Sequence, residues 1–300
     1  MADASQLITD FRRYADLIRA ALGDASVCPT DAESATALQV ERGIVYPMAL
    51  LDPRRTEFDT AGRLIELSVS DRLPTMAIVD RSGHHRPVYR GLLVYSWLQA
   101  FGIVYETLPR AQFGRWEEAL RIWCFLLEGE LGQIDWPNGP MPAGRGSSAT
   151  ESAWMALALH VAGKVFVRDA WLDLASYSFG KLTQSQNGGG PFLAATPSDN
   201  PETHWYHELV LLHSAASYAV QAEDRTVAAA VARNAQWQFN ETQPDHATTQ
   251  PWALFAFIWN PTTRTLADQI LHNVSVQPPD SAISLMLLAD ALYCLELFTK

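Results

Sequence analysis

The sequence predicts an all-α protein, an (α/α)6 barrel or toroid of about six helical hairpins in a single domain over residues 1–300. Three observations predict it. Almost every apolar pattern repeats with the helical period, and only the short stretch PTMAIVD at 74–80 reads as a strand. Segments with one charged face alternate with segments that are apolar all round, as expected when outer helices cover inner ones.

The first third of the chain contains four of the expected helices. Their spacing predicts the ranges 4–22, 33–51, 61–72 and 87–106. Charged residues such as Asp10 and Arg12 interrupt the first range, so it does not read as a signal peptide. We find no run of about 18 apolar residues and therefore expect no membrane span and a cytoplasmic protein.

The pattern of the remaining sequence predicts four helix pairs, each with one outer and one inner helix. The amphipathic outer helices are expected over 114–130, 168–184, 224–241 and 262–274. The apolar inner helices are expected over 149–163, 201–220, 247–259 and 281–298. Pro201 suits the first position of its helix, with Asn200 as the N-cap. Long loops such as 131–150 and 187–203 precede inner helices, so a site is expected over the inner N-termini.

Composition excludes several classes of function. A net charge of −11 does not provide the basic stripe of a nucleic-acid groove. The cysteines Cys28, Cys124 and Cys294 are scattered, so we expect free buried thiols rather than disulfides or a cysteine-based metal site.

The stretch ASYSFGKLTQSQNGGGPF at 175–192 resembles the QW-type repeat of terpenoid cyclases, in which an outer helix ends in Gln before a Gly-rich turn and an aromatic residue. Here Gln184 or Gln186 matches the Gln, and Phe192 stands where that family has Trp. The resemblance to terpenoid cyclase and protein prenyltransferase toroids implies the fold over about the last 190 residues. Similar turns also occur in α/α barrels that act on polysaccharides.

The resemblance does not extend to a catalytic motif. The sequence lacks the Asp-x-Asp-Asp acid motif of class II cyclases and the Asp-x-Cys pair with which prenyltransferases hold zinc. His204, His207 and Glu208 could supply three metal ligands, but neither zincin order matches HWYHE at 204–208, so we expect no metal and no cofactor and leave a metal at this cluster as an open alternative. Whether the protein is an enzyme, its oligomeric state and its reaction stay open.

Residues that could take part in catalysis or binding lie near the expected N-terminal ends of the inner helices. His204, His207 and Glu208 share one helical face. Candidates for acid/base catalysis are Glu208, His207, Asp245, His246 and Glu151. Candidates for substrate binding are His204, Trp205, Tyr206, Trp252, Asp135, Trp136 and Gln250. The alternative is that these polar groups only satisfy helix ends.

The first functional hypothesis is a terpenoid-cyclase-like toroid whose central aromatic pocket binds an apolar or isoprenoid-type small molecule and transforms it by acid/base chemistry. One alternative is a carbohydrate-active α/α barrel of the glycoside hydrolase or polysaccharide lyase type, in which two of Asp135, Glu151, Glu208 and Asp245 cleave the glycan by acid/base chemistry. The other is a non-catalytic binding or scaffold toroid. Asp290, a single charge in the apolar run SLMLLADALYCLELF, is expected to be paired rather than catalytic, and His213 to lie deeper than the candidate cluster. His84 and His85 are expected in a solvated loop.

Overall fold

The computed structural model describes residues 4–24, 45–53, 77–79, 85–87, 90–105, 110–132, 149–186, 190–193, 201–242, 244–277 and 282–299. This part of the chain is all-α apart from one short antiparallel hairpin of β1 (Ala77–Val79) and β2 (His85–Pro87). The strand expected within 74–80 is therefore present. His85 falls in β2, whereas His84 lies outside the described residues.

The helices follow the predicted windows closely. They are α1 (Ala4–Asp24), α4 (Arg90–Val104), α5 (Arg110–Leu131), α6 (Ala149–Val165), α7 (Asp169–Ser185), α8 (Pro201–Gln221), α9 (Arg225–Glu241), α10 (Pro244–Thr248), α11 (Leu254–Trp259), α12 (Arg264–Val276) and α13 (Ala282–Thr299). Pro201 is the first residue of α8, as predicted, because its fixed φ suits a helix start and its missing N–H is not needed there. Of the helix expected at 33–51, residues 45–51 are helical and residues 33–44 lie outside the described residues. The helix expected at 61–72 and the N-cap Asn200 lie outside the described residues.

The expected inner helix at 247–259 is interrupted. The structure has the short helix α10 and then α11, with a break between them. Pro251 lies in this break, where it disfavours helical backbone at the residue before it. Ala253 then adopts the left-handed conformation with φ 55° and ψ 16°. The inner helix therefore begins at Leu254, later than the sequence predicts.

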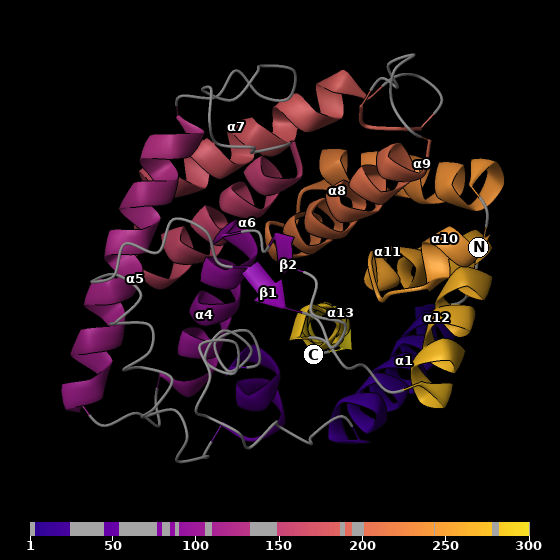
Figure 1. The fold of residues 1–300 in the computed structure, drawn as a ribbon, viewed down its shortest axis with the longest axis horizontal. Coiled ribbons are helices and arrows are strands. Elements are labelled where there is room, and N and C mark those ends of the chain that lie inside the picture. The colour runs from indigo at the N-terminus through magenta and orange to yellow at the C-terminus, as the bar shows by residue number, and fades with distance from the viewer. Residues whose placement is uncertain are drawn as a thin grey trace.

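The helices form an inner and an outer layer (Figure 1). The inner helix α6 is buried from Thr150 to Gly163 and packs against α4, α7 and α8. The outer helix α7 buries only one stripe, which includes Trp171 and Phe179. In Figure 1, α5, α7, α9, α12 and α1 lie at the periphery around α4, α6, α8, α11 and α13. The alternation in hydrophobic pattern thus corresponds to alternation between layers.

The N-terminal helix packs against the last two helices of the chain. Helix α1 contacts α13 extensively and α12 to a smaller extent. Polar side chains reinforce this contact: Arg264 Nη1 lies 2.5 Å from Asp10 Oδ2, and Arg19 Nη2 lies 2.7 Å from Glu296 Oε1. The first and last described helices are therefore side by side.

Two turns that join an inner helix to an outer one share the same geometry. Val167, between α6 and α7, has φ 54°, and Glu223, between α8 and α9, has φ 55°. In each turn the next residue donates its N–H at 2.9 Å to a carbonyl near the end of the preceding helix, as in a Schellman cap. The hairpins therefore repeat in backbone conformation even where their residues differ.

The Gly-rich stretch that carries the resemblance ends α7 with a specific contact. Gln186 Nε2 donates to the carbonyl oxygens of Gly190 at 2.8 Å and Ala230 at 3.0 Å, and Gln186 Oε1 accepts from Arg233 at 2.6 Å. Gly190 has φ 129°, and an added Cβ would lie 2.4 Å from Trp237 Cβ. Of the two candidate glutamines, Gln186 thus joins α7 to α9.

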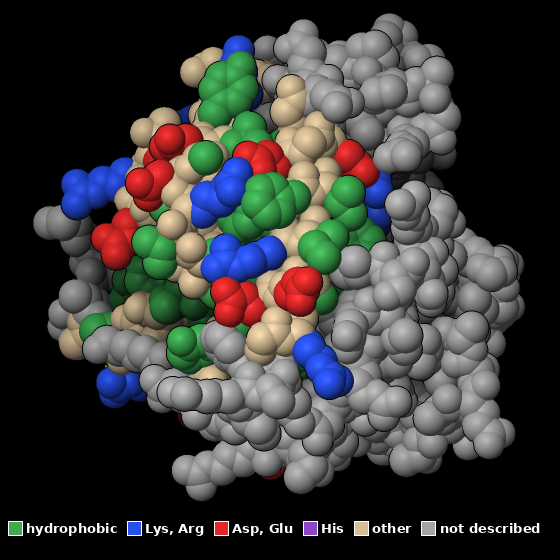
Figure 2. All heavy atoms as spheres, turned by 90° about the vertical axis from the view of Figure 1, so that its left-hand side faces the viewer, with side chains coloured by type: hydrophobic (Ala, Val, Ile, Leu, Met, Phe, Trp, Pro, Cys, Tyr) green, Lys and Arg blue, Asp and Glu red, His purple; other side chains and the backbone are tan. Residues whose placement is uncertain are grey.

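The side of the molecule that carries α5 has a mixed surface (Figure 2). Apolar, basic and acidic side chains are interspersed there, and Phe125 and Leu126 are each 50% exposed. The guanidinium of Arg168 lies over the rings of Phe125 and Trp171, so part of this apolar surface is covered by a cation.

The state of the cysteines and the character of the helices bear on two further expectations. Cys124 and Cys294 are free and buried, as expected, and Cys28 lies outside the described residues. None of the described helices combines the length and the apolar character needed to cross a membrane.

Candidate functional site

The predicted catalytic residue Glu208 is fully buried and holds two neighbouring segments together. Its carboxylate accepts the N–H groups of Phe192 and Leu193, both at 2.8 Å, and the Nδ2 group of Asn234 on α9 at 2.7 Å. Burial raises the pKa of Glu208 to about 7, while these three donors lower it. Glu208 therefore fixes residues 190–193 against α8 and α9.

The predicted catalytic residue Glu151 lies in the first turn of α6. Its Oε1 accepts the N–H of Gly91 at 3.1 Å, at the start of α4. Its Oε2 is buried and has no hydrogen-bond partner within the described ranges. Burial raises the pKa of Glu151 to about 7, against the lowering effect of the Gly91 N–H and of Arg90. Gly91 permits this contact because an added Cβ would lie 2.4 Å from the Met155 backbone nitrogen.

Several predicted aromatic residues do come together. The rings of Trp205 and His246 lie 5.1 Å apart, and those of Tyr206 and Trp252 lie 5.9 Å apart. Trp252 is buried and packs further inward against Trp154. The N-terminal end of α8 thus contacts α10 through His246 and the segment between α10 and α11 through Trp252.

The remaining predicted residues are more dispersed. His204 is nearly buried beside Trp237, with ring centroids 6.1 Å apart. His207 and Gln250 are half-buried, and Asp245 is exposed. Two predicted residues lie outside the described part of the chain: Asp135 and Trp136.

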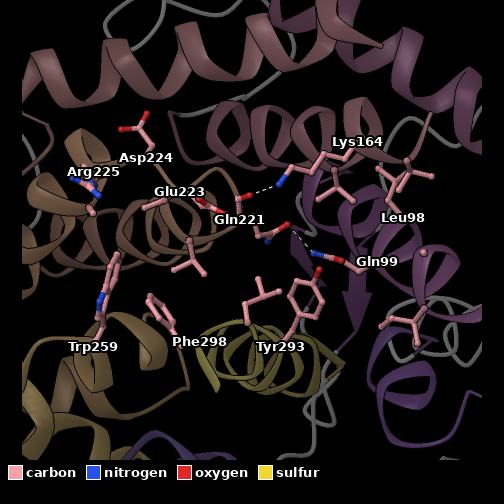
Figure 3. A pocket seen from close by; sticks show the side chains of 18 residues that line it. Leu98, Gln99, Lys164, Gln221, Glu223, Asp224, Arg225, Trp259, Tyr293 and Phe298 are labelled. Carbon is pink, nitrogen blue, oxygen red and sulfur yellow. Dashed lines mark hydrogen bonds between the residues drawn. The ribbon is translucent and has the colours of Figure 1, made fainter. Parts of the chain in front are cut away.

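A cavity of about 690 Å³ lies at the other end of the inner helices (Figure 3). It is bounded by the C-terminal parts of α4, α6 and α8, by the α8–α9 turn, and by the ends of α11 and α13. Its walls are mainly apolar and include Leu98, Ile103, Val161, Trp259, Leu297 and Phe298. Its volume is in the range of roughly 300–1,000 Å³ that is typical of small-molecule sites.

Polar side chains close one side of the cavity. Gln99 Nε2 donates to Gln221 Oε1 at 3.2 Å, and Lys164 Nζ donates to the carbonyl oxygen of Gln221, the last residue of α8 (Figure 3). Burial lowers the pKa of Lys164, and the carboxylate of Glu223 raises it. These groups bring hydrogen-bonding capacity to a largely apolar space.

Behind these side chains lies a buried polar cluster centred on Asp290, on α13. Its carboxylate accepts hydrogen bonds from the hydroxyl groups of Tyr95 and Ser217 and, at 3.5 Å, from that of Tyr46. His213 Nε2 lies 3.0 Å from Asp290 Oδ2. Asp290 is therefore paired, as predicted, and it joins α13 to α4, to α8 and to the helix at 45–51.

The hydrogen bonds assign the tautomer of His213. The backbone N–H of Ala253 donates to His213 Nδ1 at 3.1 Å, so Nδ1 acts as an acceptor. Nε2 therefore carries the proton and donates it to Asp290. Ala253 is the residue with left-handed backbone in front of α11, so this break in the inner helix serves to direct an N–H at the imidazole.

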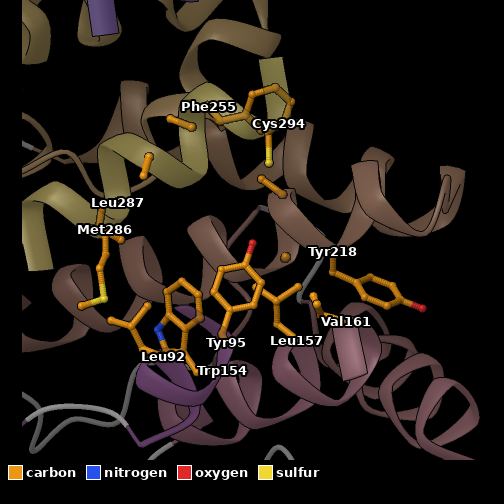
Figure 4. Packing of buried hydrophobic residues seen from close by; sticks show 14 of the residues in the cluster. Leu92, Tyr95, Trp154, Leu157, Val161, Tyr218, Phe255, Met286, Leu287 and Cys294 are labelled. Atoms are coloured by element: carbon orange, nitrogen blue, oxygen red, sulfur yellow. The ribbon is translucent and has the colours of Figure 1, made fainter. Parts of the chain in front are cut away.

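Apolar side chains surround the Asp290 cluster and fill the space around it. Figure 4 shows Tyr95 of α4 beside Trp154 of α6, with Met286 and Cys294 at separate turns of α13. Burial, followed by the charge of Asp290, raises the pKa of Tyr95 and of Cys294 well above the usual ranges. The phenol and the thiol are thus kept protonated, and the cluster is a closed network rather than an open catalytic surface.

Sequence reasoning does not identify the cavity. Gln99, Gln221 and Lys164 lie at C-terminal helix ends, where short turns and common residue types give no functional signal. One sequence pattern could have indicated the cavity: polar residues occur near the C-terminal ends of the successive inner helices α4, α6 and α8. Among the described residues, no group of three or more His, Cys, Asp or Glu side chains is placed to hold a metal ion.

Comparison with known proteins does not assign a family. No protein-family model matches the chain, and no curated protein or solved structure matches it significantly.

Proposed function

We propose that the chain is a single-domain α/α toroid in which six helical hairpins surround one axis. The packing of α1 against α13 supports closure of the outer layer. Tyr46 supports closure of the inner layer, because its ring lies 6.2 Å from that of Tyr95 on α4 and 6.5 Å from that of Tyr293 on α13. The repeated turns at Val167 and Glu223 support a common hairpin unit.

The proposed function is the binding of an apolar small molecule of isoprenoid type. The observation that carries this proposal is the cavity of about 690 Å³ with apolar walls from the six helices α4, α6, α8, α9, α11 and α13. Burying an apolar molecule there stabilises a complex by about 25 cal/mol for each Å² removed from water. The aromatic side chains of Trp259, Tyr293 and Phe298 offer flat faces to unsaturated carbon chains.

Binding without turnover is the part of this function that the geometry favours. Asp290 is separated from the cavity by Tyr95 and the two glutamines, and the two carboxylates that do line it, Glu223 and Asp224, belong to the α8–α9 turn. At the rim, Asp224 is already engaged as the N-cap of α9, where it accepts two backbone N–H groups. Product analysis after incubation with a bound isoprenoid tests for turnover separately from affinity.

Equilibrium dialysis with labelled farnesol tests the binding proposal. The decisive variant is Gly102→Phe, because Gly102 lines the cavity and an added Cβ meets only Val165 Cγ2, at 3.9 Å. The matched control is Gly129→Phe on α5, where nothing lies within 4 Å of an added Cβ. We expect saturable binding to the unmodified protein, at least tenfold weaker binding to Gly102→Phe and unchanged binding to the control. Equal binding to both variants, or none to the unmodified protein, would refute the proposal.

A scaffold function is the second candidate, because within the described ranges Asp290 and its hydrogen-bond partners Tyr95, His213 and Ser217 are all buried. This candidate predicts that no farnesol is retained and that Gly102→Phe leaves every property except stability unchanged. The same dialysis experiment therefore decides between the two.

A further inference from the structure

We propose that the cavity selects a neutral alcohol, whose hydroxyl group is held between Gln99 and Lys164 while its apolar chain contacts the walls. This inference rests on the proposed function and adds the chemical class of the ligand.

The Asp290 carboxylate fixes the direction of the Tyr95 hydroxyl. A carboxylate only accepts hydrogen bonds, so the phenol donates its one proton to Asp290. The phenol oxygen is then left as an acceptor. It receives Gln99 Nε2 at 2.8 Å and Gln221 Nε2 at 2.9 Å.

The orientation of the Gln99 amide follows from that of Tyr95. Its nitrogen is directed at the Tyr95 oxygen and at Gln221 Oε1, which uses both N–H groups. Its oxygen therefore faces away from Tyr95, and within the described ranges it accepts no hydrogen bond. Because Gln99 lines the cavity, this oxygen is available to a ligand that can donate.

Lys164 supplies the complementary donor. An ammonium group has three N–H donors, and one of them is used by the carbonyl oxygen of Gln221. Within the described part of the chain the other two donors have no hydrogen-bond acceptor, and Lys164 also lines the cavity. A hydroxyl group matches this pair because it donates to Gln99 Oε1 and accepts from Lys164 Nζ at the same time.

The charges around the cavity disfavour an anionic head group. The lining contains two cations, Lys164 and Arg225, and two carboxylates, Glu223 and Asp224. These charges cancel, whereas a phosphate or diphosphate site needs an excess of basic groups. An anion would also accept hydrogen bonds without donating, which leaves the Gln99 oxygen unsatisfied.

The test compares three ligands of matched carbon skeleton by equilibrium dialysis: farnesol, the hydrocarbon farnesene and the anion farnesyl phosphate. We expect farnesol to bind about tenfold more tightly than the other two, since one or two net hydrogen bonds correspond to roughly that factor. Gln99→Leu removes the advantage of farnesol over farnesene, and the exposed matched control Gln269→Leu keeps it. Lys164→Met, at a position more exposed than Gln99, gives a second variant in which the advantage is also reduced, and urea unfolding of both variants shows whether each is folded.

The outcomes separate this inference from the proposed function. Equal affinity for farnesol and farnesene, tighter binding of farnesyl phosphate, or an advantage that survives in Gln99→Leu and Lys164→Met would overturn the inference while binding itself stands. Failure of all three ligands to bind the unmodified protein would overturn both.

Discussion

Replacement of Glu151 by Gln should stabilise the protein above neutral pH. Glu151 is buried at the contact between α6 and α4, with one oxygen bonded to Gly91 N–H and the other without a partner in the described structure. In the variant, the amide oxygen still accepts the Gly91 N–H, and no charge has to be buried.

The magnitude follows from the pKa of Glu151, which burial raises from 4.5 to about 7. Between these pH values the folded chain holds a proton that the unfolded chain has released. The free energy of unfolding therefore falls as the pH rises through this window, by about 3 kcal/mol for this group. The stabilising contribution of the protonated form is complete below pH 4.5 and lost above pH 7.

Urea unfolding at pH 5, 6, 7 and 8 measures this effect. The difference in unfolding free energy between Glu151→Gln and the unmodified protein should rise in favour of the variant by about 2–3 kcal/mol over this range. A stability difference that is constant with pH, or a variant that is less stable at pH 8, would refute the conclusion that ionisation of buried Glu151 destabilises the folded protein.

Glu208→Gln is the matched contrast and should destabilise the protein, although burial raises the pKa of Glu208 to about 7 as well. All three of its partners are N–H donors, so an amide group would direct its own N–H₂ at one of them. We expect a loss of about 2–3 kcal/mol at pH 8, also measured by urea unfolding. A stabilised Glu208→Gln variant would contradict the described contacts.

Three further predictions concern local structure. Asp290→Asn should cost about 3 kcal/mol in unfolding free energy, because the amide would face a donor from His213 or a hydroxyl group; a cost near zero would contradict the cluster. Gly190→Ala should cost about 2–4 kcal/mol by thermal unfolding, since the new Cβ would lie 2.4 Å from Trp237 Cβ; unchanged stability would show a different turn. Val167→Gly should stabilise by about 0.5–1 kcal/mol, because Val167 is 88% exposed and has φ 54°; a loss of stability would argue against the left-handed cap.

Much of the helical layout could be predicted because it depends on local pattern. The apolar surface of α6 and the single buried stripe of α7 are visible in the sequence as hydrophobic periodicity. The break before α11 was missed, although Pro251 is a local signal for it, because proline also suits the start of a helix. The left-handed conformation of Ala253 and its hydrogen bond to His213 have no counterpart in the local pattern.

The site was harder to predict because its parts are distant in sequence. Asp290 was expected to be paired, but its partners Ser217 and Tyr46 lie 73 and 244 residues away. In the sequence, Gln99 and Gln221 look like ordinary polar residues. Only the structure shows that the Tyr95 hydroxyl orients both amide groups. The histidines near the start of α8 gave a conspicuous pattern, yet the cavity is formed at the other end of the same helix.

A crystal structure of the protein grown with farnesol tests the central claim most directly. The account predicts ligand density between Trp259, Tyr293 and Phe298, with the hydroxyl group within hydrogen-bonding distance of Gln99 Oε1. Density at the N-terminal end of α8, beside Trp205 and His246, or inner helices that do not share an axis, would contradict it.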